Sequence, residues 1–125
     1  MDIEEKQLVW MGSSRKDLKT FPEDVKDVIG FALDSAQKGG KSPVAKPLSG
    51  KQFSGKGVFE IVDDFDGDTY RAVYTVKLEN RIYVLHSFMK KSHNGKKTVK
   101  HDIDLILKRY KVAEEVNEKL NAEKQ

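Results

Sequence analysis

The sequence predicts an α+β domain, a small antiparallel sheet flanked by helices in the order β-α-α-β-β-β-α. Residues 58–91 alternate polar and apolar side chains over three segments separated by polar turns, which is typical of antiparallel strands. Residues 20–38 and 98–120 instead repeat apolar side chains every three or four positions, as amphipathic helices do. With 125 residues, 38% of them hydrophobic, the chain can bury one core, so residues 1–125 are expected to form a single domain.

The N-terminal elements follow from local signals. Residues 7–11, of which 8–11 are apolar, predict a short strand, and residues 13–19 predict a short helix capped by serine. Thr20 opens the sequence T-F-P-E, which resembles a capping box with proline in the first turn, and Gly39-Gly40 should end the helix that follows. The apolar stripe of this helix comprises Phe21, Val25, Val28, Ile29, Ala32, Leu33 and Ala36.

The glycine-rich and lysine-rich segment 39–57 has no helical or strand period and predicts a loop. Its GKQFSGKG sequence matches a phosphate-binding loop except at Gly57, where a serine or threonine should bind magnesium. The segment also precedes a strand instead of a helix, so a flexible basic loop is the better interpretation. The DDFDGD sequence at residues 63–68 resembles a calcium loop but lacks its glutamate, and a turn at Asp66-Gly67 explains it more simply.

Residues 68–92 predict a hairpin that turns at Glu79-Asn80. This register pairs Thr75 with Val84, Val73 with His86, and Arg71 with Phe88, and Lys90 continues the row. The opposite face should meet the helices, which are expected on one side of the sheet. That face would comprise Tyr70, Ala72, Tyr74, Val76 and Leu78, with Tyr83, Leu85, Ser87 and Met89.

The last helix is predicted from about Thr98, with Asp102 and Asp104 in its first turn, where the helix dipole favours anions. Its apolar stripe comprises Ile103, Ile106, Leu107, Tyr110, Ala113, Val116 and Leu120.

Charge is distributed unevenly. Residues 38–101 carry a formal charge of +7, against −3 for residues 1–37 and −1 for residues 102–125. A basic middle indicates a surface for a polyanion, although a solvated lysine-rich face would give the same count. The chain has no cysteine, which excludes disulfides, thiolate zinc sites and a cysteine nucleophile. The acidic N-terminal residues do not resemble a signal peptide, so we expect a cytoplasmic protein.

Arg71, His86 and Lys90 fall on one face of the predicted hairpin and are the candidate catalytic residues. RNA cleavage through the 2′-hydroxyl needs a base, an acid and positive charge at the phosphorane, and Arg71 suits the last role. A histidine, either His86 or His93, could carry the proton, and Glu60 could act as a base or orient Arg71. The candidate RNA-binding residues are Lys91, His93, Lys96, Lys97 and Lys56. The histidines lack the spacing of a metal site, and no metal or cofactor is expected.

The segments GVFEIV, TYRAVYTV, IYVLHSFMKKS and TVKHDIDLILKRY, in this order, resemble the RelE/ParE toxin superfamily, in particular its HigB-like, phage-derived branch. The resemblance implies the toxin of a type II toxin-antitoxin pair that cuts mRNA on the ribosome without metal. Its partners would be mRNA, the ribosome and a neighbouring antitoxin, often a helix-turn-helix protein. The resemblance places the strand arginine at Arg71 and leaves several acid/base candidates, namely His86, His93, His101 and Tyr110. Two alternatives stay open: a gyrase-inhibiting toxin without nuclease activity, and an inactive RNA-binding or partner-binding module.

Overall fold

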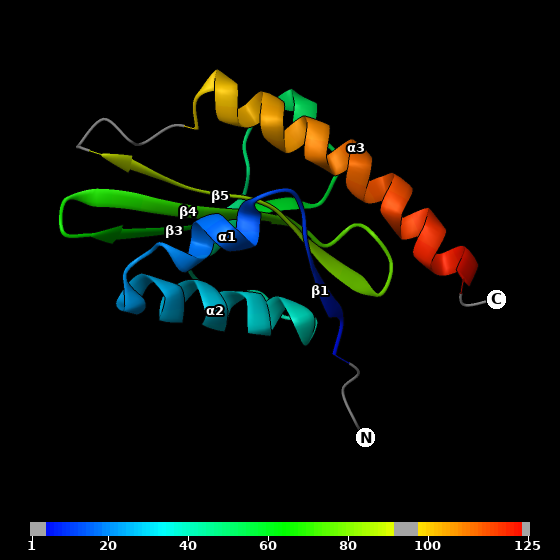
Figure 1. Cartoon of the computed structure of the whole chain (residues 1–125), viewed down its shortest axis with the longest axis horizontal. Helices are drawn as coiled ribbons and strands as arrows, with labels where there is room; N and C mark the ends of the chain where they lie inside the picture. Colours follow the sequence, from blue (N-terminus) through cyan, green and yellow to red (C-terminus); the bar gives the residue numbers. More distant parts are fainter. Residues whose placement is uncertain (1–4, 92–97, 124–125) are drawn as a thin grey trace.

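The described residues, 5–91 and 98–123 of a computed structural model, form one five-stranded sheet with helices on both faces (Figure 1). This arrangement confirms the predicted α+β class. In chain order the elements are β1 (Gln7–Trp10), α1 (Ser14–Lys19), α2 (Glu23–Gln37), β2 (Ala45–Pro47), a 3₁₀ turn (Lys51–Phe53), β3 (Val58–Phe65), β4 (Asp68–Thr75), β5 (Arg81–Lys91) and α3 (Lys100–Glu123).

The strand order is β1-β5-β4-β3-β2, and every neighbouring pair is antiparallel except β1 and β5, which run parallel. The parallel edge corrects the expectation of a purely antiparallel sheet. Alternating side chains reveal a strand but not the direction of its neighbour, so the sequence could not distinguish the two cases. The short strand β2 lies within the segment predicted as a loop, at the opposite edge.

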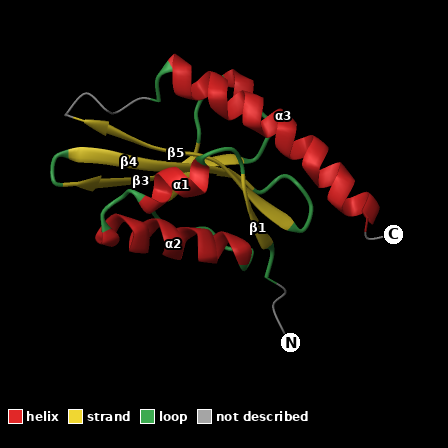
Figure 2. Cartoon of the chain, viewed as in Figure 1, coloured by secondary structure: helices red, strands yellow, loops and turns green. Residues whose placement is uncertain are grey.

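Helices α1 and α2 lie on one side of the sheet and α3 on the other (Figure 2). The expectation that all helices share one face was therefore wrong. Two apolar clusters explain the arrangement: one contains Val25 and Ile29 of α2 with Tyr74, and the other contains Ile106 of α3 with Val73. Both faces of the central strands are apolar enough to require a cover.

A bulge in β5 makes the observed strand pairing differ from the predicted pairing over part of the hairpin. Val73 lies opposite His86 and Arg71 opposite Phe88, as predicted, but Tyr74 lies opposite Val84, so Leu85 is an extra residue. A bulge turns two successive side chains toward one face. The later pairs are consequently shifted and Thr75 lies opposite Tyr83, not Val84.

The bulge also changes which side chains face α3. Tyr83 and Leu85, predicted to join the tyrosine face, instead pack in the cluster that contains Ile106 of α3. Met89, assigned to the same face, is 37% exposed. The strands end at Thr75 and resume at Arg81, so the connection is longer than the predicted two-residue turn.

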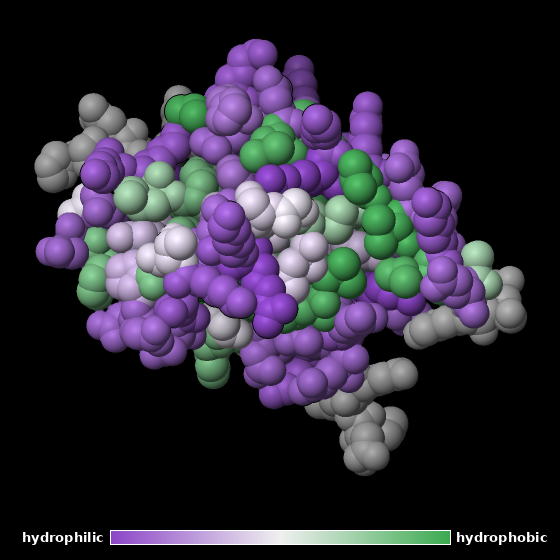
Figure 3. All heavy atoms as spheres, viewed as in Figure 1, coloured by the Kyte–Doolittle hydropathy of each residue, from purple (hydrophilic) through white to green (hydrophobic). Residues whose placement is uncertain are grey.

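The start of α2 differs from the predicted capping box. Pro22 occupies the N-cap position without a side-chain hydrogen bond, and Thr20 ends α1, where its hydroxyl donates to the Asp17 carbonyl at 2.7 Å. Of the predicted stripe, Val28 is only half-buried. No helix in the described ranges is long and apolar enough to cross a membrane. The face in Figure 3 is largely hydrophilic, with apolar side chains in small patches.

Candidate functional site

Arg71 of β4 and Glu60 of β3 form the centre of the candidate site. Both side chains lie almost fully buried on the sheet, with Arg71 only 3% exposed, and Arg71 Nε is 3.7 Å from Glu60 Oε2. The carboxylate also has Lys46 Nζ at 3.8 Å and the Thr98 hydroxyl at 3.5 Å. Among the described residues, Nε and Nη1 of Arg71 have no hydrogen-bond partner. The arrangement provides a buried carboxylate beside a cation with unfilled donors.

A cavity of about 350 Å³ lies against Glu60. Its wall is formed by Thr98 and Ile103 together with the segment between β2 and β3, namely Leu48, Ser49, Gly50 and Gln52. Cavities of about 300 Å³ and above are large enough for part of a ligand. The carboxylate is therefore placed where a small polar group could reach it.

His86 of β5 lies on the same side of the sheet and is held by three neighbours. Its ring stacks on Phe88 at 4.6 Å between centroids. Nε2 lies 2.8 Å from Asp102 Oδ1, and Nδ1 lies 3.4 Å from Arg109 Nη1. Because a guanidinium can only donate, Nδ1 is the acceptor and the Nε2 proton is donated to Asp102.

The surroundings of His86 lower its pKa. Burial is the main cause and Arg109 adds to it, while Asp102 acts in the opposite direction. His86 is only 6% exposed and both ring nitrogens are engaged, so the ring is neutral near pH 7 and joins β5 to α3. This geometry favours a positioning role over proton transfer.

Arg109 extends the cluster from α3 to the segment before α1. Its Nη1 donates to the Leu85 carbonyl at 3.0 Å, and Nη2 donates to the Ser13 hydroxyl at 3.2 Å. Ser13 in turn donates to Asp17 Oδ2 at 2.7 Å. Burial lowers the pKa of Arg109, and Asp17 opposes that effect. Gly12, with φ of +52°, lies so close to this guanidinium that a Cβ there would force the guanidinium to shift.

Two of the remaining predicted site residues, Lys90 and Lys56, lie on the same side of the sheet as Arg71 and α3. Lys90 lies opposite Thr69, in the row that contains Phe88, and Lys91 is exposed at the end of β5. The predicted RNA-binding residue Lys56 places its Nζ 5.4 Å from the centre of the Tyr110 ring. His93, Lys96 and Lys97 lie outside the described residues.

Sequence reasoning missed Asp102 and Arg109 as partners of His86. Asp102 was noted only for its place in the first helical turn, and Arg109 was not singled out. Both lie on the side of α3 toward the sheet, and their spacing of seven residues, two helical turns, was the available signal. Within the described part of the chain, no group of three or more histidine, cysteine, aspartate or glutamate side chains could hold a metal ion.

Comparison with known families agrees with the sequence resemblance. The profile of the family described as Phage derived protein Gp49-like (DUF891) matches residues 16–111. The chain belongs to this family. This membership confirms the resemblance to the phage-derived, RelE/HigB-type toxins. The matched range includes Arg71, His86 and Lys90.

No curated protein matches this Gp49-like protein. Among solved structures, one chain of the toxin-antitoxin complex RelBE2 from Mycobacterium tuberculosis is similar, with 21% identity and a TM-score of 0.46. The similarity covers 69% of this chain and 99% of that chain.

Proposed function

We propose that this protein is the toxin of a toxin-antitoxin pair and that it cleaves mRNA on the ribosome without a metal ion. Membership of the Gp49-like family supports the toxin assignment. The observation that carries the chemistry is Arg71, a buried cation whose Nε and Nη1 donors are unfilled among the described residues, beside the Glu60 carboxylate.

In the proposed reaction Glu60 takes the proton from the RNA 2′-hydroxyl. The 2′-oxygen then forms a bond to phosphorus, and Arg71 stabilises the added negative charge of the phosphorane. The bond to the 5′-oxygen breaks, and the ammonium of Lys90 donates the proton that this oxygen needs. The products are a 2′,3′-cyclic phosphate and a 5′-hydroxyl, so atoms and charge balance without a cofactor.

Glu60 is preferred over His86 as the base because its carboxylate lines a cavity, whereas both nitrogens of His86 are engaged. His86 is assigned a supporting role: with Asp102 it fixes α3 against the sheet beside the proposed site.

The burial of Arg71 favours a second candidate function. An arginine that is 3% exposed must become accessible before it can contact a phosphate, whereas a buried structural ion pair requires no such change. On this reading the protein is a toxin without nuclease activity, such as a gyrase inhibitor, or a partner-binding module.

Mapping mRNA 5′ ends after brief induction separates the two functions. We expect new 5′-hydroxyl ends with the wild type. Arg71→Lys keeps the positive charge but loses the planar guanidinium with its paired N–H donors, so cleavage should fall on the order of 100-fold or more. Lys26→Arg, on the opposite side of the sheet, is the matched control. DNA breaks without mRNA cuts would overturn the nuclease proposal in favour of the gyrase-inhibiting alternative.

A further inference from the structure

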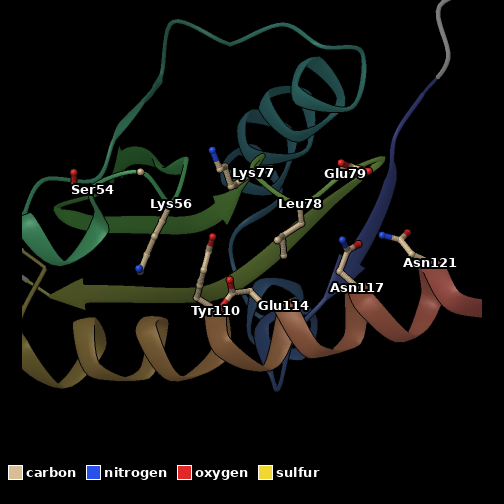
Figure 4. A pocket seen from close by; sticks show the side chains of 10 residues that line it. Ser54, Lys56, Lys77, Leu78, Glu79, Tyr110, Glu114, Asn117 and Asn121 are labelled. Atoms are coloured by element: carbon tan, nitrogen blue, oxygen red, sulfur yellow. The ribbon is translucent and has the colours of Figure 1, made fainter.

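A cavity of about 500 Å³ lies between α3, the connection after β4 and the segment before β3 (Figure 4). Tyr110, Asn117 and Asn121 rise from α3 on one side, and Lys56 approaches from the other, where Lys77 also lines the cavity but turns its ammonium away from α3. The volume is within the range of small-ligand sites, about 300–1,000 Å³. None of its lining residues belongs to the Arg71 or His86 clusters, so it is a separate site.

A buried arginine behind this cavity fixes the orientation of both asparagines. Arg81 is 2% exposed, and its Nη1 donates to Asn117 Oδ1 at 2.9 Å and to Asn121 Oδ1 at 2.7 Å. The Tyr83 hydroxyl donates to the same Asn117 oxygen at 2.9 Å. Since arginine can only donate, the amide oxygens are the acceptors, and the amide N–H groups are left for other partners. Arg81 Nε has no hydrogen-bond partner among the described residues.

The cavity wall combines these donors with carboxylates. Lys56 Nζ is held 5.4 Å from the centre of the Tyr110 ring, and Glu114 lies one turn further along α3. Burial and Glu114 raise the pKa of Tyr110, which keeps its hydroxyl protonated. A phosphate alone would be repelled by Glu114, whereas a nucleobase offers both acceptors and N–H donors.

We propose that this cavity binds one RNA nucleobase that has a carbonyl group beside a ring N–H, with higher affinity for guanine than for uracil. Binding of this base would set the sequence preference of the toxin. The guanine carbonyl accepts from the amides of Asn117 and Asn121, and its ring N–H and amino group donate to Glu114. Adenine and cytosine present a ring nitrogen lone pair at that position, which a carboxylate repels. Lys56 contacts a flanking phosphate.

This inference rests on the proposed function but can be tested without RNA cleavage. The full chain is titrated with GMP, UMP, AMP and CMP and followed by NMR. Because the phosphate is common to all four, a difference reports the base. We expect GMP to bind about 10-fold more tightly than AMP, which one base-specific contact can supply.

Glu114→Gln should reduce this preference to less than about 3-fold, since an amide can serve either kind of base. Glu115→Gln, the neighbouring exposed residue that does not line the cavity, is the matched control and should bind like the wild type. Equal binding of the four nucleotides, no binding of any, or an unchanged preference in Glu114→Gln would overturn the proposal.

Two results distinguish failure of this site from failure of the nuclease. Guanine-selective binding without mRNA cleavage would keep the nucleobase site and reject the nuclease. Cleavage that depends on Arg71, with the same bases at the cuts in the wild type and in Glu114→Gln, would keep the nuclease and reject the nucleobase site.

Discussion

The hydrogen bond between His86 and Asp102 is predicted to hold the start of α3 against the sheet. The two side chains are 8% and 14% exposed, and Nε2 and Oδ1 lie 2.8 Å apart. A hydrogen bond to a charged group contributes about 1.5–3 kcal/mol. Asp102→Asn keeps an acceptor oxygen but removes the charge, which should cost roughly half of that value. Loss of an acid from the first helical turn adds about 0.3–1 kcal/mol, so we expect a total near 2 kcal/mol.

Asp104→Asn provides the matched control on the same helix. Asp104 pairs with Lys100 at 3.2 Å, but these side chains are 60% and 90% exposed, and such pairs contribute about 0.3–0.5 kcal/mol. The free energies of unfolding are compared by urea denaturation at pH 7, followed by far-UV circular dichroism. If Asp102→Asn loses no more stability than Asp104→Asn, His86 does not join α3 to the sheet, and its proposed positioning role is wrong.

Three further results are expected. Stability should fall as the pH drops below 6.5, because the unfolded state then binds a proton that the lowered pKa of His86 denies to the folded state. His86 can change the free energy of unfolding by at most about 1.4 kcal/mol per pH unit. Urea midpoints measured at several pH values should therefore depend less on pH in His86→Gln than in the wild type. Gly12→Ala should destabilise the fold by about 1–3 kcal/mol, because its φ is +52° and the new Cβ would lie 2.6 Å from the Arg109 guanidinium. Gly30→Ala, inside α2 with nothing within 4 Å, should instead stabilise by about 0.5–1 kcal/mol in the same thermal or urea assay.

The sequence predicted the face of Arg71 and His86 correctly because strand alternation extends through both strands on one side of the bulge. On the N-terminal side of Leu85 the predicted strand pairing was wrong. A bulge shifts the pairing but leaves no signal in the composition of a run of apolar residues. Thr20 was misassigned for a related reason: the same threonine can start one helix or end the previous one, and here its hydroxyl bonds back to Asp17.

The partners of His86 could not be predicted from the sequence. Asp102 and Arg109 lie 16 and 23 residues away, and only the packing of α3 across the sheet brings them to the ring. The expectation that all helices cover the opposite face of the sheet placed α3 away from His86, although the family resemblance named His101 and Tyr110 of this helix as candidates. The orientation of the two asparagines at the nucleobase site depends likewise on Arg81, which is distant from both in the sequence.

The unfilled hydrogen-bond donors of buried arginines distinguish the two proposed sites from the rest of the fold. Arg109 places its guanidinium nitrogens on Leu85, Ser13 and His86, as a structural arginine does. Arg71 and Arg81 instead leave donors without partners among the described residues, at a cost of about 1–3 kcal/mol for each buried group. Each of these two lies beside a side chain that lines a cavity, which is Glu60 for Arg71 and the asparagine pair for Arg81. Ser87 Oγ is also buried without a partner among the described residues, but it carries no charge. The two arginines, each beside a side chain that lines a cavity, instead hold positive charge ready for a ligand that brings acceptors, and RNA brings them at every nucleotide.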